Sequence, residues 1–322
     1  MTATDAGTRH RAQSIVPTVL SRGVYVLLAV LVAIGLAFLP EFRSVDNLIN
    51  VLRSVSLVGI AALGVGFVTL AGSFVDLSVA SIVGVAGVLT LSVARHSAGL
   101  ALIATLAVAL GIGTVNGLIV GRMRANPILL TLASTTIVGG LLLVATQSKV
   151  TYGTGTWLQT FAGATVLKIP TTVIVFVVLT VLCQLALTRT TWGRRVLAVG
   201  SNERTALFAG LHVPSIRTQV FMISGLFAGI TGLLLAGNQG SATATAGTGY
   251  EFDALTAVIV GGSRLTGGKG SAVGTLAGAV LVGVLSNLLV LWGLPYSLQQ
   301  VVKGALLVIT VGLSQTFGAN RG

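Results

Sequence analysis

The chain has 322 residues, of which 8% are charged and 54% are hydrophobic, and its formal net charge is +12. Soluble domains carry about 25% charged residues, so this composition excludes a soluble globular protein and predicts a polytopic membrane protein. A strongly basic soluble protein would suggest nucleic-acid binding. Here the basic residues lie between apolar runs, where they set topology. We therefore expect contact with a lipid bilayer and no nucleic-acid partner.

The N-terminal part of the chain begins with a polar, basic stretch, residues 1–22, expected to form a cytoplasmic tail. The first apolar run, residues 23–39, has no signal-peptide cleavage site after it, which predicts a retained helix ended by Pro40. Residues 41–54 carry apolar side chains at helical spacing with charges opposite. They are too short and too charged to cross a membrane, so we predict an interfacial amphipathic helix. The second span is expected at residues 55–71.

An acidic residue, Asp76, stands between the second and third apolar runs. A carboxylate facing lipid is costly, so Asp76 is expected to face water, protein or the start of a helix. We predict that Asp76 or Ser78 caps the third span, residues 79–94. In the alternative, Asp76 binds a hydroxyl group of a ligand.

The fourth span is predicted at residues 99–120 and carries glycines at four-residue spacing, Gly113, Gly117 and Gly121. Such a stripe of small residues suits close contact between helices in a membrane. Asn116 lies beside this stripe. It is expected to bridge two helices, the commoner role, or to line a pathway.

Two further spans are predicted at residues 127–145 and 170–187. The interval between them, residues 147–169, is polar and contains Trp157. Tryptophan is typical of the membrane–water interface, so this interval is predicted to be an external loop.

The longest polar interruption of the chain is residues 190–210. Its second half is predicted to be a short helix: Asn202 is a candidate N-cap, Glu203 suits the positive helix start, and Gly210 ends it. Ala206 and Ala209 would give this helix a low-relief face. A small helix pair between two membrane spans could dock on a soluble partner. The alternative is a solvated loop whose arginines only fix its orientation.

The seventh span is predicted at residues 219–236, followed by a polar stretch, residues 238–249, that forms an external loop or lines a cavity. A short eighth span is expected near residues 254–262. The glycine-rich segment after it superficially resembles a phosphate-binding loop. The pattern requires glycine at the first position, where this chain has Ser263. It also requires serine or threonine after the lysine, but glycine follows Lys269. ATP binding by that route is therefore excluded.

The ninth span, residues 272–292, has Gly274 and Gly278 on one face, suited to helix packing, and Asn287 farther along as a candidate pathway or structural residue. The tenth span, residues 296–313, contains Lys303. We expect this side chain to snorkel outward by default, and pairing with an acid of another helix is the alternative.

The elements together predict an all-α integral membrane protein of about ten transmembrane helices, with nine or eleven crossings as alternatives. In this topology thirteen Lys and Arg residues lie inside and five outside, which favours cytoplasmic termini. The expected organisation is a cytoplasmic tail at 1–22, a permease domain at 23–316 with a coupling loop at 189–218, and a cytoplasmic tail at 317–322.

Three sequence blocks resemble one family of transport proteins. The first has the pattern G-R-x-x-x-A-x-G-x-N-E-x-x-A-x-x-x-G and consists of Gly193, Arg194, Ala198, Gly200, Asn202, Glu203, Ala206 and Gly210. It resembles the cytoplasmic coupling loop of ABC importer permeases of the ribose and branched-chain amino acid class. Residues 245–279 resemble ribose-type sugar permeases, and DLSVAS from Asp76 is similar to their DLSVGS block. The segment near Asp76 is one residue longer than in those permeases.

The resemblance implies the permease subunit of an ABC importer in the bacterial inner membrane, with a monosaccharide (ribose-, xylose- or galactose-like) or related polyol as solute. It implies three kinds of partner: cytoplasmic ATPase subunits that hold ATP and grip the coupling loop, an extracytoplasmic solute-binding protein, and a second permease copy or paralogue. The chain itself is expected to be non-catalytic, with no cofactor and no metal site. It has only three histidines and no paired carboxylates in one segment.

Three alternatives stay open. The solute could be a branched-chain amino acid or a nucleoside. An ion-driven secondary transporter would need acids within the membrane, for which Asp76, Glu251 and Asp253 are the candidates. A membrane scaffold without transport activity fits the composition but gives residues 202–210 no role.

Overall fold

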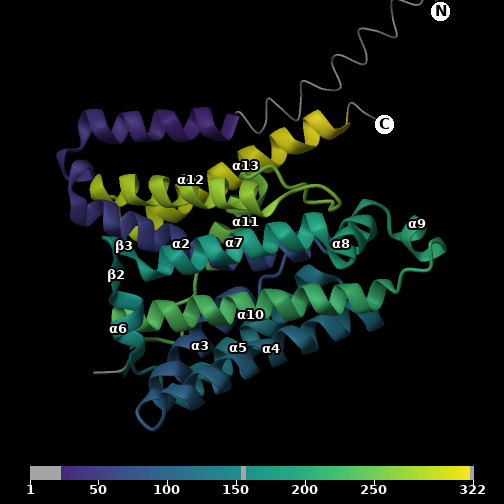
Figure 1. The fold of residues 1–322 in the computed structure, drawn as a ribbon, viewed down its shortest axis with the longest axis horizontal. Helices are drawn as coiled ribbons and strands as arrows, with labels where there is room; N and C mark the ends of the chain where they lie inside the picture. The colour runs from purple at the N-terminus through teal and green to yellow at the C-terminus, as the bar shows by residue number, and fades with distance from the viewer. Residues whose placement is uncertain (1–22, 154–156, 320–322) are drawn as a thin grey trace, which may run out of the picture.

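The structure is a computed structural model that describes residues 23–153 and 157–319, and it is a bundle of helices (Figure 1). The helices are Gly23–Phe38, the 3-10 helix η1 (Pro40–Arg43), α2 (Val45–Leu70), α3 (Val79–Ala94), α4 (Ala98–Met123), α5 (Pro127–Thr146), α6 (Trp157–Gly163), α7 (Thr171–Arg189), α8 (Thr191–Ser201), α9 (Glu203–Phe208), α10 (Val213–Gln239), α11 (Tyr250–Val260), α12 (Ala272–Leu291) and α13 (Tyr296–Ala319).

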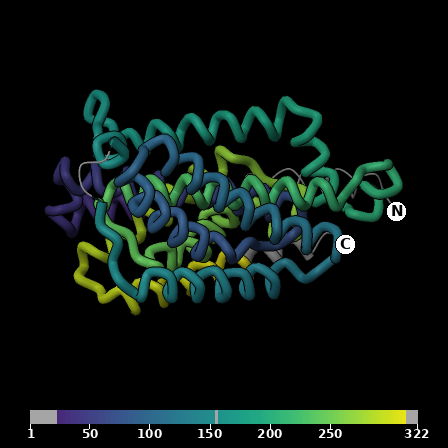
Figure 2. Tube along the Cα trace, turned by 90° about the horizontal axis from the view of Figure 1, so that it is seen from below, coloured from purple at the N-terminus to yellow at the C-terminus, as the bar shows by residue number. Residues whose placement is uncertain are grey.

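The connecting segments gather at the two ends of the bundle (Figures 1 and 2). One end, here the α6 end, holds α6 and two antiparallel strand pairs, β1 (Thr151–Tyr152) with β4 (Ser241–Ala242) and β2 (Thr165–Val166) with β3 (Ile169–Pro170). The other end, the α9 end, holds α8 and α9, and α13 finishes on the same side (Figure 1).

Six of the described helices are long and apolar enough to cross a membrane: α2, α4, α5, α7, α10 and α12. The central helices are α2 and α10, each 78% buried over its most apolar window, whereas the same window of α5 is only 6% buried. An apolar helix face without protein contact is stable in lipid and costly in water. The chain is therefore a multi-pass, all-α membrane protein, as predicted, while the count of ten spans stays a prediction.

The second span differs from the prediction. The prediction of a separate interfacial helix at residues 41–54 is wrong, because α2 is one continuous helix of 26 residues that starts at Val45. Ser44 caps it by accepting a hydrogen bond from the Asn47 backbone N–H at 3.1 Å. Arg53, one of the charges that argued against a span, lies in the first half of α2 and donates to the Gly163 carbonyl at 2.9 Å.

Glycines allow α4 to lie directly against α10. A Cβ atom added at Gly113 would lie 2.5 Å from the Phe221 carbonyl oxygen, and one at Gly117 would lie 2.7 Å from that of Thr218. Contacts this short to backbone cannot be relieved by a side-chain rotation. Both glycines therefore face protein and set the distance between the two helices.

The hairpin of α11 and α12 is packed in the same way. A Cβ atom at Gly274 would lie 2.2 Å from the Gly261 carbonyl oxygen, and one at Gly278 would lie 1.9 Å from that of Ala257. Because both contacts are to backbone, the two helices can keep this separation only with glycine at these positions.

Candidate functional site

The α8–α9 element, residues 191–208, projects from the α9 end between α7 and α10 (Figure 1). Its helix starts are capped by side chains: Thr190 accepts from the Gly193 N–H at 3.0 Å, and Asn202 accepts from the Thr205 N–H at 3.0 Å. The chain leaves α9 through Gly210, whose φ of +77° suits glycine. The short helix predicted from Asn202 to Gly210 thus has the expected caps at both ends.

An ion pair fixes α9 against the start of α10. Glu203 accepts from the Arg217 guanidinium at 2.6 Å, and the side chains are 40% and 16% exposed, respectively. This partner of Glu203 was not predicted, because the two residues are adjacent only once the chain folds back at Gly210.

The outward face of α9 differs from the expectation. Ala206, predicted to give the helix a low-relief outer face, is 3% exposed and packs into the protein core. The apolar side chains that face outward are Leu207, at 45% exposed, and Phe208, at 92%. Arg194 is exposed on α8. The protruding surface of the element is therefore aromatic and basic.

Two glycines of the predicted coupling pattern hold α8 against the rest of the chain. A Cβ atom at Gly193 would lie 2.2 Å from the Ala186 carbonyl oxygen of α7, and one at Gly200 would lie 1.9 Å from that of Leu70 at the end of α2. Gly210 has open space around it. The first two glycines thus permit tight internal packing.

Three segments distant in sequence meet where α8 ends. The Gly268 N–H donates to the Leu70 carbonyl at 2.9 Å, and a Cβ atom at Gly267 would lie 2.6 Å from the Gly72 nitrogen and 2.9 Å from the Gly200 oxygen. We call these five residues the glycine junction. It connects the α8–α9 element to α2 and to the loop that precedes α12.

Asp76 lies in the non-helical segment between α2 and α3 and is fully buried. Its Oδ1 atom accepts hydrogen bonds from the Ser78 backbone N–H at 3.0 Å and the Ser78 hydroxyl at 2.5 Å. The predicted start of α3 at Val79 is confirmed, with Ser78 at the N-cap position. The predicted side-chain cap is absent, because the Ser78 hydroxyl is engaged by Asp76. Asp76 holds its own segment in place.

The two candidate asparagines have different surroundings. Asn287 of α12 exchanges side-chain hydrogen bonds with Asn47 of α2, at 2.7 and 3.1 Å, and so bridges two helices. Asn116 is 2% exposed and lies at an apolar groove of about 470 Å³ between α4 and α5. Among the described residues its side-chain nitrogen has no hydrogen-bond partner, so this nitrogen bridges no helices there.

Lys303 does not snorkel, contrary to the default expectation. Its Nζ atom lies 2.7 Å from Oδ2 of Asp253 on α11, and each side chain is 12% exposed. The alternative, pairing with an acid of another helix, is the one the structure shows. The opposite charge of Asp253 compensates the buried lysine.

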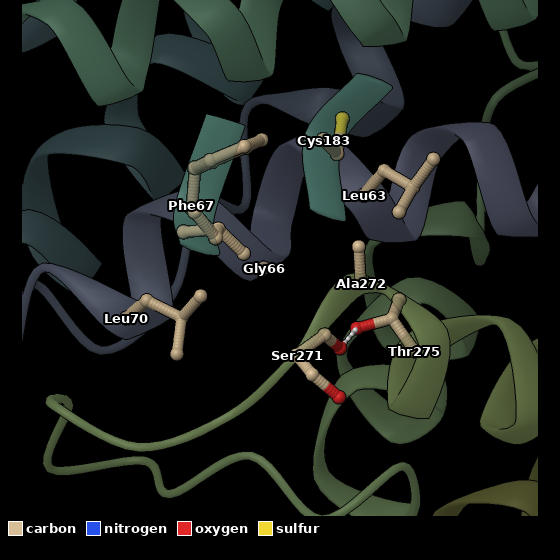
Figure 3. Close-up of a pocket in the computed structure, with 9 residues that line it drawn as sticks. Leu63, Gly66, Phe67, Leu70, Cys183, Ser271, Ala272 and Thr275 are labelled. Atoms are coloured by element: carbon tan, nitrogen blue, oxygen red, sulfur yellow. Dashed lines mark hydrogen bonds between the residues drawn. The ribbon is translucent and has the colours of Figure 1, made fainter. Parts of the chain in front are cut away.

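The cavity between α2, α7 and α12 has no room for a solute. Its lining includes Leu63, Phe67, Cys183 and Thr275, and its volume is about 10 Å³ (Figure 3), roughly the space of one water molecule. Thr275 donates to the Ser271 carbonyl at 3.2 Å within the same view. This gap is a packing feature of the bundle.

The sequence matches a known transport family over most of its length. The family model described as the permease component of a branched-chain amino acid transport system matches residues 47–311. The chain belongs to this permease family. The resemblance inferred from the three sequence blocks is confirmed.

Individual relatives of this permease are named as sugar transporters. It is 36% identical to the ribose import permease protein of Bacillus subtilis (strain 168), over 91% of this chain and 92% of the relative. It is 32% identical to the L-arabinose ABC transporter permease protein of Azospirillum brasilense, over 91% and 87%. It is 30% identical to the D-allose transport system permease protein of Escherichia coli (strain K12), over 91% of each. No solved structure matches the chain.

Proposed function

We propose that this permease is the membrane subunit of an ABC importer that carries a monosaccharide or a related polyol into the cell. The observation that carries the proposal is that relatives named for ribose, L-arabinose and D-allose match it over at least 87% of their length. They differ in the sugar, so the shared feature is transport of small polyhydroxylated solutes.

The chain provides the pathway and leaves ATP hydrolysis to partner subunits. The glycine-rich loop before α12 lacks the phosphate-binding pattern. Docking of an ATPase on the α8–α9 element is supported by its projection from the bundle (Figure 1) and by the exposure of Phe208 on α9 and of Arg194 on α8.

With an ATPase docked there, the α9 end and both termini would face the cytoplasm and the α6 end would face outward, in the inner membrane of a bacterium. A solute-binding protein would deliver sugar at the α6 end, and a second permease would complete the pathway. Closure of the ATPases on ATP would push the α8–α9 element. Through the glycine junction this movement reaches α2 and the α11–α12 hairpin, so the bundle alternates between two rigid arrangements.

A second candidate solute is a branched-chain amino acid, because the family model is described by that transport system. The test is uptake by proteoliposomes that contain the permease, its ATPase and its binding protein. We expect ATP-dependent uptake of D-ribose, L-arabinose or D-allose, and none of L-leucine. Uptake of L-leucine alone would identify the amino acid alternative. Uptake driven by an ion gradient without the ATPase would contradict the ABC mechanism.

A further inference from the structure

A polar cavity of about 570 Å³ lies between α11, α13 and the segment before α11. Its lining includes Thr248, Tyr250, Asp253, Tyr296, Gln300 and Lys303. Other positions of α13 present exposed apolar side chains, Val301 at 65%, Val308 at 71% and Ile309 at 59%. The cavity is therefore a polar interruption in an otherwise apolar outer surface.

The charged groups of this cavity are only partly satisfied. Lys303 contacts Oδ2 of Asp253 at 2.7 Å. Asp253 is 9% exposed, and its other oxygen, Oδ1, has no hydrogen-bond partner among the described residues. A buried carboxylate oxygen without a donor is unfavourable and calls for an explanation. A hydroxyl group of a bound molecule would supply the missing donor.

The cavity lies between helices in the half of the molecule nearest the α6 end. Tyr296 begins α13 at that end, and Lys303 follows about 10 Å farther along at 1.5 Å per residue. Residues 243–249 descend beside α3 without helix, and a Cβ atom at Gly247 would lie 2.0 Å from the Ala80 carbonyl oxygen. Irregular backbone at membrane depth is tolerated where it is buried or lines a water-filled cavity.

We propose that this cavity binds the transported sugar during its passage across the membrane, an inference that rests on the proposed function. The ion pair has no net charge and the other lining groups are neutral, so the cavity offers no excess charge for an ionic solute. Sugar hydroxyls donate to Asp253 and accept from Lys303 and from the second N–H of the Gln300 amide, whose nitrogen also donates to the Tyr296 hydroxyl at 2.5 Å. The rings of Tyr250 and Tyr296 provide flat apolar faces for the C–H side of a pyranose or furanose ring.

The competing explanation is that the ion pair only ties α11 to α13. The first test therefore leaves the pair intact and compares Gln300→Leu with Gln299→Leu. Both replace a glutamine of α13 by leucine. Gln299 instead donates to the Leu294 carbonyl at 2.8 Å and does not line the cavity. The variants are assayed in the complete importer in proteoliposomes, with D-ribose as the probe.

We expect Gln300→Leu to reduce ATP-dependent uptake about tenfold, the loss that corresponds to one or two hydrogen bonds to the solute. Stimulation of ATP hydrolysis by the sugar-loaded binding protein should remain, because the binding protein and the ATPase are untouched. Gln299→Leu should transport as the wild type does. Wild-type uptake by Gln300→Leu, or an equal loss in both variants, would overturn the proposal.

A charge exchange tests the ion pair itself. Asp253→Lys combined with Lys303→Asp keeps a pair between α11 and α13 but reverses the group presented to the sugar. A folded exchange variant without uptake supports contact between the pair and the solute. Wild-type uptake by the exchange variant would show that the pair only ties the helices together. If the exchange variant does not fold, the comparison of Gln300 with Gln299 decides.

The wild-type importer separates the two levels of inference. If the wild type takes up no sugar at all, the proposed function fails. If the wild type and all cavity variants take up D-ribose equally well, the importer reading stands and only the assignment of the cavity is wrong.

Discussion

Phe208 is the most exposed apolar side chain of the α8–α9 element, with 92% of its surface accessible. Aromatic side chains that fill a pocket on a partner contribute strongly to binding. We predict that Phe208→Ala leaves the permease folded, since substitutions at exposed positions change stability by about 0.5 kcal/mol or less. The variant should no longer co-purify with its ATPase and should lose uptake.

The control for this variant is Leu167→Ala, which shortens an apolar side chain that is 91% exposed in the β2–β3 turn at the α6 end. It should retain both the ATPase and transport. Retained co-purification by Phe208→Ala would mean that Phe208 is not part of the docking surface.

Substitution of the neighbouring Ala206 should lower the stability of the permease itself, unlike substitution of Phe208. It is 3% exposed and packed inside the chain, so Ala206→Glu would bury a carboxylate without a partner, at a cost of several kcal/mol. We predict a lower melting temperature of the isolated permease in detergent, before any ATPase is added. An unchanged melting temperature would show that α9 can turn this side chain outward.

The helix contacts offer a prediction at the scale of elements. Gly117→Leu and Gly278→Leu would each force a side chain into the backbone of a neighbouring helix, because the added Cβ atoms would lie 2.7 and 1.9 Å from it. Overpacking typically costs about 1–3 kcal/mol, so both variants should melt at lower temperature in detergent.

Gly111→Leu is the matched control for these contacts. Gly111 belongs to α4, as Gly117 does, but no heavy atom lies within 4 Å of its added Cβ. It should melt as the wild type does. Equal loss of stability in Gly111→Leu and Gly117→Leu would attribute the effect to bulk in α4 and contradict the close-contact interpretation.

Local signals predicted the elements whose ends are set by local chemistry. The start of α3 at Val79 and the caps of α9 at Asn202 and Gly210 follow from side chains a few residues away. The start of α2 was mispredicted, because charges at residues 41–54 are equally compatible with an interfacial helix and with the end of a long span. The distinguishing contact, from Arg53 to α6, is made 110 positions along the chain.

Pairings across long sequence separation could not be predicted from periodicity. Lys303 and Asp253 are 50 residues apart, and their meeting depends on how α13 returns along α11. The sequence singled out Lys303 as a cation in an apolar segment that needs compensation, but its partner Asp253 was not predicted. The face of α9 that carries Ala206 was mispredicted for the same reason, since its burial depends on the folding back of α10.

At the scale of the whole molecule, tight backbone contacts connect the α8–α9 element to the pathway candidates. The glycine junction joins α8 to the end of α2 and to the loop before α12. Gly274 and Gly278 then pack α12 on α11, and α11 carries Asp253. In the proposed mechanism, a force applied at the α8–α9 element would reach the polar cavity through this packed backbone, because close-packed interiors transmit strain.

The orientation of the molecule in the membrane is the last prediction. Ala209→Cys lies on an exposed turn at the α9 end, and Leu167→Cys lies on an exposed turn at the α6 end. Each is placed in a Cys183→Ser background, because Cys183 is the single native cysteine. A membrane-impermeant maleimide added to intact spheroplasts should label only Leu167→Cys, and added to inside-out vesicles only Ala209→Cys. Labelling of both from one side would contradict a membrane crossing by α7 between the two positions.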